Sequence, residues 1–468
     1  MNISIILAAG ESTRMKSKLS KVLHRVAGKP ILEYIIEASK GAKVEKNVVI
    51  VGRSGDKVRE YFKDEPIIFK TQPIGEGIPY GTGFAVMQAT EYIEDDSTVV
   101  ILYGDTPLIR ESTITNLFNY HKENDLDATV LTAILDNPKD YGRIVRGENG
   151  NVLKIVEEKD ASEEIKKIKE INSGIYCFKG KLLKDALAKI DNNNAQNEYY
   201  ITDVIEILKN EGYSVGAYVI EDPNEIHGIN SRAQLAFCEN IMRDRINQYH
   251  MGNGITIIDP DNTYIEAGVK IGRDSIIYPG VVLEGKTEIG EDCIIRGDTR
   301  IVNSIISAGV SIESSTIEDS FVGEDTKIGP YAHIRPNSRI GKNVKIGNFV
   351  EVKNSTIKDN SKASHLAYIG DADIGYNVNI GCGVVFVNYN GKEKFRTIVG
   401  DNAFIGSNSN LVAPVEVEPW GYIAAGSTIT KGVKEGELCI ARAPQVNIPG
   451  WVERKGLKKQ SNLGGNNK

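Results

Sequence analysis

The fold of the C-terminal half is decided by a stretch with a period of six, IGKNVKIGNFVEVK at residues 340–353. An aliphatic residue stands at every sixth position, at Ile340, Ile346 and Val352. A period of six fits neither an amphipathic helix nor a plain hairpin. It is typical of a parallel β-helix of hexapeptide repeats, in which each short strand points one aliphatic side chain inward and a tight turn follows.

The same period recurs on both sides of this stretch. The aliphatic positions form three unbroken runs: Ile265, Ile271, Ile277, Leu283 and Ile289; Val322, Ile328, Ile334, Ile340, Ile346 and Val352; Val399, Ile405, Leu411, Val417, Ile423 and Ile429. Three strands close one triangular coil of about eighteen residues, and stacked coils bury a continuous core that no single coil buries alone. The pattern therefore predicts a left-handed parallel β-helix.

Composition limits the class of protein. A chain of 468 residues suggests two to four domains of ~100–200 residues each. The 56 basic and 63 acidic residues give a formal net charge of −7, which argues against binding to nucleic acid or membrane surfaces. No apolar run approaches the ~18 residues of a membrane span, and no secretory signal is expected. The five cysteines are dispersed, as in a reduced cytoplasmic protein.

The N-terminal half follows a different pattern. Apolar runs of strand length alternate with helical runs: Ile3–Leu7, Ile31–Ser39, Asn47–Val51, Phe84–Tyr92, Thr98–Leu102, Ile114–Lys122 and Ala128–Leu135. This alternation predicts βαβ units on a mainly parallel sheet, with ligands beyond the carboxyl ends of the strands. We expect a Rossmann-like α/β domain over residues 1–231, a connecting helix over 232–252, and the β-helix domain over 253–468. Its polar tail, from about 455 to 468, is expected to be disordered.

A candidate phosphate-binding loop follows the first strand. Ala8, Ala9 and Gly10 are small enough for the backbone to approach a ligand, and Arg14 and Lys21 supply positive charge. Neither the Rossmann GxGxxG nor the P-loop GxxxxGK[ST] is present. Taken alone, the loop is equally consistent with an ordinary strand–helix turn that carries surface charges.

Further motifs occur in a familiar order. They are Leu7-Ala8-Ala9-Gly10, Thr13-Arg14-Met15, Lys21-Val22-Leu23, Gln72, Gly81-Thr82-Gly83, Leu102-Tyr103-Gly104-Asp105, Tyr141-Gly142-Arg143, Ile155-Val156-Glu157, Glu170-Ile171-Asn172-Ser173-Gly174, Asn197-Glu198-Tyr199-Tyr200-Ile201-Thr202-Asp203 and Gly228-Ile229-Asn230. This order resembles the sugar-phosphate nucleotidylyltransferases. With the hexapeptide half attached, residue 3 to about residue 451 is similar to the bacterial family of bifunctional N-acetylglucosamine-1-phosphate uridylyltransferases/glucosamine-1-phosphate acetyltransferases.

The resemblance implies synthesis of UDP-N-acetylglucosamine, a peptidoglycan and lipopolysaccharide precursor, in two steps. Acetyl-CoA first acetylates glucosamine-1-phosphate, and UTP then gives its uridylyl group in a Mg²⁺-dependent step. Asp105 and Asn230 would hold Mg²⁺, and Arg14 and Lys21 would stabilise the leaving pyrophosphate. An Asp after a strand can also be a plain Asx-turn residue. The implied nucleotide and sugar residues are Leu7, Ala8, Ala9, Gly10, Lys21, Gln72, Gly81, Thr82, Tyr103, Gly104, Asp105, Gly142, Glu157, Asn172 and Asn230.

Two irregular stretches, residues 360–373 and 386–395, interrupt the later coils, where a solenoid often carries function. His365 lies in the first, and a surface histidine is most often merely solvated. The resemblance implies that His365 takes the amine proton during acetyl transfer, with Glu351 able to orient its ring. The implied sugar-phosphate residues are Arg335, Lys353, Tyr368, Asn379 and Lys394. The implied acetyl-CoA residues are Cys382, Asn388, Tyr389, Ser407, Ala425 and Arg442. The family also implies a homotrimer with acetyl-CoA pockets between chains.

The chain departs from the family pattern at a few positions. Ser12 and Ser20 replace a usual Gly and Pro, and Cys382 and Asn390 replace a usual Ala and Asp. The loop Pro73–Tyr80 is longer than the pattern, which leaves the contacts to uracil open.

Two other functions are compatible with parts of the sequence. A nucleotidylyltransferase with a hexapeptide tail used only for assembly would lack a base in the solenoid loops, yet His365 is present. A non-enzymatic scaffold would have lost Arg14, Lys21 and Asp105, and all three are intact. Both alternatives are therefore disfavoured.

Overall fold

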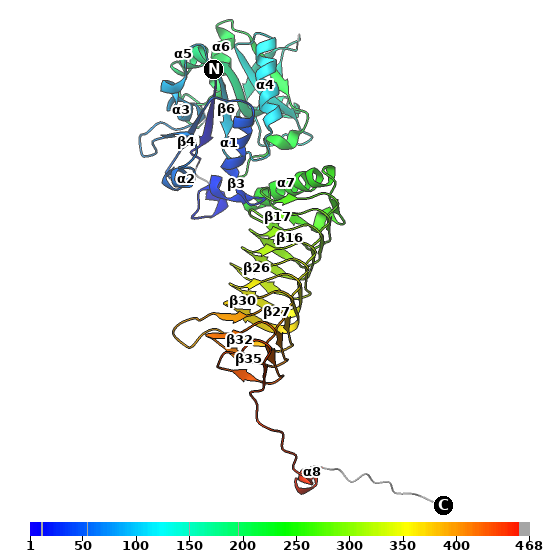
Figure 1. Ribbon diagram of the computed structural model, residues 1–468. Coiled ribbons are helices and arrows are strands. Elements are labelled where there is room, and N and C mark those ends of the chain that lie inside the picture. Colours follow the sequence, from blue (N-terminus) through cyan, green and yellow to red (C-terminus); the bar gives the residue numbers. More distant parts are fainter. Residues whose placement is uncertain (11–12, 54, 149, 195, 458–468) are drawn as a thin grey trace, which may run out of the picture. The chain divides into compact units, whose positions relative to one another are not determined.

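The structure is a computed structural model that describes residues 1–457 except 11–12, 54, 149 and 195 (Figure 1). The chain divides into two compact units. The first comprises Met1–Gly252 and Tyr264–Gly268, and the second comprises Asn253–Thr263 and Val269–Lys468. Most of the tail predicted to be disordered lies outside the described residues, and so does Ser12. No helix among the described residues is long and apolar enough to cross a membrane.

The first unit is built on a nine-stranded sheet with the order β11-β7-β10-β6-β1-β4-β5, to which β8 and β9 are added beside β10. The strands of this order are parallel except β10, which runs antiparallel to β6 and β7. Their bounds are β1 Asn2–Ala8, β4 Lys46–Val51, β5 Ile68–Thr71, β6 Thr98–Tyr103, β7 Ala128–Ile134, β8 Arg143–Arg146, β9 Val152–Val156, β10 Glu170–Lys179 and β11 Val215–Val219. A small ribbon pairs β2 (Arg25–Val26) with β3 (Lys29–Pro30).

Helices cover both faces of this sheet, because alternate strand residues point to opposite sides and form two apolar clusters. One cluster includes residues of α1 (Ile31–Gly41), α2 (Gly55–Tyr61), α4 (Glu111–Glu123) and α7 (Arg232–Gly252). The other includes residues of α3 (Thr82–Met87), α5 (Gly180–Leu187) and α6 (Thr202–Asn210). The predicted α/β architecture is confirmed, and each predicted run of apolar residues falls within or beside one of these elements.

The second unit is a parallel β-helix with three columns of paired strands (Figure 1). One column contains β14 Lys270–Ile271, β17 Glu288–Ile289, β20 Ile305–Ile306, β23 Phe321–Val322, β26 Arg339–Ile340, β28 Thr356–Ile357, β30 Ala372–Ile374, β33 Thr397–Val399 and β36 Val415–Val417. The second contains β12 Thr256–Ile257, β15 Ile276–Ile277, β18 Ile294–Arg296, β21 Ser311–Glu313, β24 Lys327–Ile328, β31 Asn379–Ile380, β34 Phe404–Ile405, β37 Tyr422–Ile423 and β39 Leu438–Cys439. The third contains β16 Val282–Glu284, β19 Arg300–Val302, β22 Thr316–Glu318, β25 His333–Ile334, β32 Val385–Val387, β35 Asn410–Val412 and β38 Thr428–Ile429.

The hexapeptide period explains this architecture. Ile340, Ile346 and Val352 are buried, as the pattern predicts, and their equivalents in neighbouring coils pair in register. Asp, Asn and Gly with positive φ recur at the corners, as at Asp274 and Asn343, where they turn the chain with little strain. Two longer strands, β27 (Lys345–Lys353) and β29 (Lys362–Gly370), continue past a corner and so belong to two columns at once.

Candidate active sites

The candidate phosphate loop begins where the first strand ends. β1 and β6 are adjacent and parallel, with Leu7 opposite Tyr103, so their carboxyl ends meet at one edge of the sheet. The Gly104 N–H donates to the Leu7 carbonyl over 2.9 Å. A Cβ added at Gly104 would lie 3.0 Å from the Ala8 Cβ, so glycine allows this close approach. The loop residues and Asp105 therefore share one side of the sheet edge.

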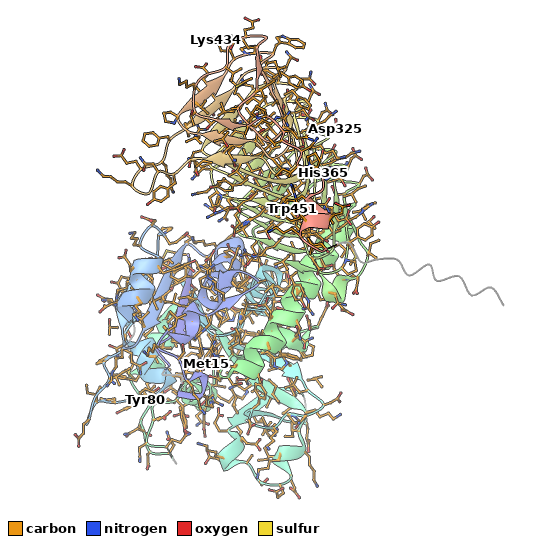
Figure 2. The ribbon with its side chains drawn as sticks, turned by 90° about the horizontal axis from the view of Figure 1, so that it is seen from below. Met15, Tyr80, Asp325, His365, Lys434 and Trp451 are labelled. Atoms are coloured by element: carbon orange, nitrogen blue, oxygen red, sulfur yellow. The ribbon has the colours of Figure 1, made fainter. Side chains whose placement is uncertain are left out.

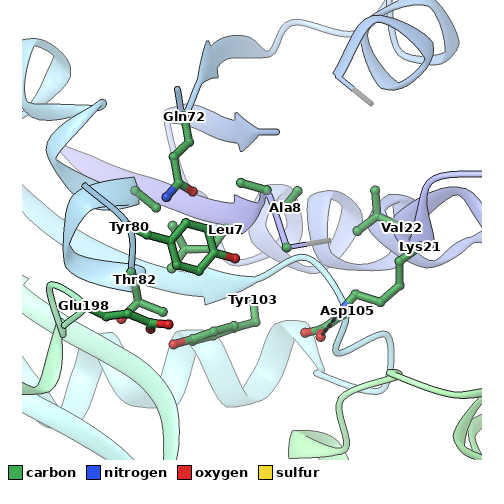
Figure 3. A pocket seen from close by; sticks show the side chains of 14 residues that line it. Leu7, Ala8, Lys21, Val22, Gln72, Tyr80, Thr82, Tyr103, Asp105 and Glu198 are labelled. Atoms are coloured by element: carbon green, nitrogen blue, oxygen red, sulfur yellow. Dashed lines mark hydrogen bonds and ion pairs between the residues drawn. The ribbon is translucent and has the colours of Figure 1, made fainter. Parts of the chain in front are cut away.

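A cavity of about 250 Å³ opens at this edge (Figure 3). Ten residues predicted for the nucleotide site line it: Leu7, Ala8, Ala9, Gly10, Lys21, Gln72, Gly81, Thr82, Tyr103 and Asp105. Four further lining residues, Val22, Tyr80, Ala85 and Glu198, were not predicted as site residues. Val22 and Glu198 stand in the motifs quoted above, whereas Tyr80 and Ala85 do not, and only the fold brings all four to the same cavity.

Two oxygen atoms converge on one cation beside this cavity. Lys21, in the short helix η2 (Lys21–Leu23), places its Nζ 2.5 Å from Asp105 Oδ2 and 2.9 Å from Asn230 Oδ1. The Ile229 N–H donates to the Asp105 carbonyl, which holds the 228–230 segment against the strand end. The two residues predicted to hold a metal, although 125 positions apart, are thus brought to a common point.

Positive charge continues beyond Lys21. A second cavity, of about 240 Å³, is lined by Gly10, Lys18, Lys21, Gly52 and Arg53, among others. Lys18 and Arg53 were not predicted. Arg14, predicted beside Lys21, is exposed in the short helix η1 (Thr13–Met15) and is not among the residues that line either cavity.

Of the four residues implied for the sugar, Gly142, Glu157 and Asn172 come together at three neighbouring strands, whereas Asn230 lies beside Lys21. The Asn172 N–H donates to the Gly142 carbonyl, and Glu157 follows β9, which pairs with β8. A Cβ at Gly142 would lie 3.2 Å from Glu157 Oε1, so a side chain there would crowd the carboxylate. Glu157 and Asn172 line a cavity of about 270 Å³ that shares Thr82, Tyr103 and Glu198 with the nucleotide cavity.

The sugar cavity is crowded with carboxylates. Burial raises the pKa of Glu157, and the nearby Asp160 adds to the effect. Burial likewise raises the pKa of Asp203 to about 6, with repulsion from Glu206, Asp191 and Glu157 contributing. Arg143, whose side chain is 2% exposed, pairs with Glu158 over 2.7 Å. A cation is therefore held close to this acidic group without entering the cavity lining.

The longer loop Pro73–Tyr80 does not fill the nucleotide cavity. Of its residues only Tyr80 is part of the lining. The preceding residues turn outward, with the Ile78 N–H donating to the Gly75 carbonyl and Gly77 at φ +75°. The added length is therefore accommodated mainly outside the cavity.

His365 lies on the outside of the β-helix (Figure 2), where β29 continues past a corner. Its neighbour across the β27–β29 pair is Asn348, whereas Glu351 stands opposite Tyr368. The Glu351 carboxylate instead accepts from Arg335 Nη1 over 2.7 Å. The role of Glu351 in orienting the His365 ring therefore stays a prediction, and the pair with Arg335 in the preceding coil occupies one of its two carboxylate oxygens.

Cations gather near the acetyl site. The pKa of Lys353 is lowered by the adjacent Lys394, with burial and Arg335 contributing. Asp371, which was not predicted, accepts hydrogen bonds from the side chains of Asn354 and Asn388. Burial alone would raise the pKa of Asp371, but these hydrogen bonds and the two lysines lower it, so the carboxylate stays ionised.

Three of the six predicted acetyl-CoA residues, Cys382, Ser407 and Ala425, form a column along one corner. Ala363, Ile380, Ile405 and Ile423 are paired in successive coils, and the residues two positions after them are His365, Cys382, Ser407 and Ala425. Backbone hydrogen bonds join the turns, including Asn408 N–H to the Cys382 carbonyl and Gly426 N–H to the Ser407 carbonyl. Arg442 continues this column, since a Cβ at Gly426 would lie 3.8 Å from Arg442 Cδ.

The second irregular stretch is a small hairpin. Tyr389 bridges Lys394, and the Phe395 N–H donates to the Asn388 carbonyl. Asn390, the departure from the family's Asp, accepts from the backbone N–H groups of Lys392 and Glu393 and so caps the turn. Outside this hairpin, Asn379 of β31 lies opposite Lys362 of the neighbouring strand β29.

Known proteins match this chain over almost its whole length. The family model "Nucleotidyl transferase" matches residues 3–223, and "Bacterial transferase hexapeptide (six repeats)" matches residues 268–303. "GMPPB C-terminal domain" matches residues 317–419. The "Bifunctional protein GlmU" of Clostridioides difficile (strain 630) is 58% identical over 97% of this chain and 98% of its own length. The proteins of the same name from Alkaliphilus oremlandii and Alkaliphilus metalliredigens are 57% and 54% identical, each over 98% of this chain and 99% of their own lengths.

The chain belongs to the GlmU family.

Membership in the GlmU family agrees with both sets of motifs. The chain is a bifunctional uridylyltransferase and acetyltransferase that makes UDP-N-acetylglucosamine. The two alternatives, an assembly tail and a scaffold, are thereby set aside. A solved structure of a putative glucose-1-phosphate thymidylyltransferase from Bacillus anthracis matches at 19% identity and a TM-score of 0.43, over 52% of this chain and 96% of its own, and adds nothing to this assignment.

Proposed function

We propose that the two reactions run at two separate sites, one in each unit, with residues assigned as follows. The first unit transfers the uridylyl group of UTP to N-acetylglucosamine-1-phosphate with the help of Mg²⁺. The second unit first makes that sugar phosphate from glucosamine-1-phosphate and acetyl-CoA, and does so as a homotrimer. Both nucleotide and thioester are cytoplasmic metabolites, and dispersed thiols suit the same compartment.

The convergence of Asp105 and Asn230 on Lys21 Nζ is the observation that carries the uridylyl proposal. Two hard oxygen ligands aimed at one point fit Mg²⁺, which takes its remaining ligands from water and phosphate. No group of three or more His, Cys, Asp or Glu side chains in the described part of the chain offers an alternative metal site. Bound there, Mg²⁺ would neutralise charge on the phosphates of UTP.

The protein's own groups then align the reactants. Ala8, Ala9 and Gly10 allow the phosphates to approach the backbone, and Lys21, Lys18 and Arg53 line the adjoining cavity on the side where pyrophosphate leaves. Arg14, which lies outside both cavity linings, is the further cation assigned to the leaving pyrophosphate. Because the sugar and nucleotide cavities share Thr82, Tyr103 and Glu198, a sugar phosphate held at Glu157 and Asn172 can reach the α-phosphate.

At the acetyl site, His365 accepts the proton of the attacking amine, which must be neutral to attack the thioester. The cations Arg335, Lys353 and Lys394 hold the sugar phosphate, and Tyr368 and Asn379 complete the assigned set. Acetyl-CoA runs along the corner column from Cys382 to Arg442. Asn388, with Nδ2 donating to Asp371, and the aromatic ring of Tyr389 border the acyl end. Direct transfer requires no nucleophile, so Cys382 serves only as a contact.

The surface of the β-helix supports the trimer. Tyr331 and Phe349 occupy one corner in successive coils, each 61% exposed and with φ of +60° and +58°. Their rings stack with centroids 5.6 Å apart. Large apolar residues in a left-handed conformation cost free energy, and their exposure leaves an apolar ridge that a second copy would cover. Leu366, 58% exposed in the next coil, extends this ridge.

One assay tests the assignment. Purified protein is given glucosamine-1-phosphate, acetyl-CoA, UTP and Mg²⁺, and both thiol release and UDP-N-acetylglucosamine are followed. We expect both products, with chelation of Mg²⁺ abolishing only the nucleotide sugar. Loss of thiol release on chelation would contradict the assignment of two independent sites. So would the absence of thiol release from glucosamine-1-phosphate and acetyl-CoA in a preparation that converts added N-acetylglucosamine-1-phosphate to the nucleotide sugar.

A further inference from the structure

The nucleotide cavity has an aromatic wall that none of the motifs predicts. Tyr80 lines the cavity together with Leu7, Gln72 and Thr82, and Figure 3 shows its ring within the group formed by these side chains. The side chain is at the base of the longer loop and is 41% exposed. A large ring that is neither buried in the core nor fully in solvent is positioned to cover a flat ligand.

The backbone of Tyr80 is firmly held although the loop before it turns outward. The Tyr199 N–H donates to the Tyr80 carbonyl over 2.8 Å, and the Gly83 N–H donates to the Tyr199 carbonyl over 2.8 Å. Gly81 has φ +120°, and a Cβ there would lie 2.4 Å from the Tyr199 carbonyl oxygen. The chain can therefore follow this path only with glycine, and the position of Tyr80 is set by the fold.

The other lining residues of the cavity suit different parts of a nucleotide. Ala8, Ala9 and Gly10 form a low wall that the phosphates of the nucleotide can approach closely. The buried Gln72 offers an amide, which can pair with the edge of uracil. A tyrosine face in the same cavity suits the face of the base, and stacking of this kind tolerates any base because every base has a π-face.

We propose that the Tyr80 ring packs against the uracil of UTP and supplies affinity for the nucleotide, whereas the choice of base rests with other groups. This inference rests on the proposed uridylyl function. It makes the longer loop a means of presenting one aromatic side chain to the base. The phenol hydroxyl takes no part in the proposal, so phenylalanine at this position should serve as well as tyrosine.

The test compares Tyr80→Ala, Tyr80→Leu and Tyr80→Phe in the full-length protein. Base–aromatic stacking is worth about 1–3 kcal/mol per base, so Tyr80→Ala should raise the KM for UTP about 5- to 150-fold with little change in kcat. Tyr80→Leu should fall between, and Tyr80→Phe should match the wild type within about twofold. The ratio of kcat/KM for UTP to that for CTP should stay constant in all three. Calorimetric titration with UTP gives the affinity without catalysis.

Tyr213→Ala is the matched control, because Tyr213 is also partly exposed in the first unit and is outside the lining of the nucleotide cavity. It should behave as wild type, and acetyl transfer in every variant reports that the chain has folded. An unchanged KM in Tyr80→Ala, a loss confined to kcat, or a Tyr80→Phe defect equal to that of Tyr80→Ala would overturn the inference. Failure of the wild type to use UTP would instead overturn the proposed function.

Discussion

The proposed uridylyl site is enclosed within one unit, whereas the proposed acetyl site is spread over the outside of the β-helix. In the first unit, a sheet edge gathers side chains from segments as distant as Ala8, Gln72 and Asp105 into one cavity. In the second, His365 and the acetyl-CoA column stand on exposed corners of successive coils. A solenoid coil contacts only its neighbours, so it can present a surface but cannot close a pocket by itself.

The two sites also differ in charge. Carboxylates crowd the sugar cavity, where burial raises the pKa of Glu157, and burial also raises the pKa of Asp203, which follows the lining residue Thr202. Cations crowd the acetyl site, where Lys394 lowers the pKa of Lys353. In the proposed arrangement, a sugar held through its hydroxyl groups can tolerate acids around it, because its phosphate would point toward Mg²⁺ and Lys21. A phosphate held without a metal needs the cations themselves, and their mutual repulsion is relieved when the dianion binds.

The sharpest test of this separation is His365→Ala. Removing the proton acceptor should lower acetyl transfer about 10²- to 10⁴-fold, the usual worth of general-base catalysis, and should leave uridylyl transfer unchanged. Binding of glucosamine-1-phosphate should change little, because Arg335, Lys353 and Lys394 remain. Stopped assays of both reactions on one preparation measure this. If the variant kept more than half of the wild-type acetyl-transfer rate, His365 would not be the general base and the role would have to be assigned to another residue.

Asp105→Asn is the converse test. Loss of a charged ligand should lower uridylyl transfer about 10²- to 10³-fold, by analogy with loss of a principal electrostatic stabiliser. Acetyl transfer should be normal. Asp136→Asn is the control, because Asp136 is fully exposed and its carboxylate pairs with Lys169 at the surface. Equal loss of both activities in Asp105→Asn would point to misfolding and remove support for the metal assignment.

Phe349→Asp tests whether the open site needs a second chain. A charge in the apolar ridge should cost at least about 2 kcal/mol of association, about 30-fold in the association constant, as at other interface hot spots. Light scattering should show dissociation, and acetyl transfer should fall with it while uridylyl transfer persists. Trp420→Asp is the control, since Trp420 is equally exposed at another turn, with φ +59°. A stable trimer with full acetyl transfer would show that the ridge is not the interface.

The smallest expected effect concerns the crowded acids. The pKa of Asp203 is about 6 in the fold, above its ordinary value of 3.8, so the folded state disfavours the ionised form. The resulting cost is present above pH 6 and disappears as the pH falls toward 4. Asp203→Asn should therefore stabilise the first unit at pH 8 by about 1 kcal/mol, after discounting for solvent exposure, and not at pH 4.

Calorimetry of the full-length protein measures this stabilisation as a change in the Tm of the first unit. The unfolding transition of the first unit is identified as the one that shifts when UTP is added. A gain of about 2–4 °C in Tm at pH 8 that vanishes in acid is the expected result. An equal gain at both pH values would attribute the effect to helix propensity or packing in α6 instead of to ionisation.

Much of the architecture could be predicted because it is repetitive. Each hexapeptide repeats one local rule, aliphatic inward and small turn residue at the corner, so Ile340 or Ile405 could be assigned to the core without knowledge of its partners. The α/β half was predictable from alternating periods. Resemblance to a family supplied the candidate residues of both sites, and ten of those for the uridylyl site line one cavity.

Other features followed only from the coil size and the sheet order. The strand register places Glu351 opposite His333, so Arg335, two residues further along, lies close enough to pair with the Glu351 carboxylate. The register of the next coil places His365 opposite Asn348. Asp371 joins Asn354 and Asn388, each 17 residues away, for the same reason. No local pattern marks such pairs, because their spacing depends on where each corner turns.

The periods and motifs of the chain were thus sufficient for its two architectures, its family and the kind of chemistry at each site. Which side chains share a cavity was a matter of tertiary structure. Tyr80 faces the base cavity because Tyr199, 119 residues later, fixes its backbone through hydrogen bonds. Local sequence specifies local conformation, but a site made from distant segments depends on the packing that brings those segments together.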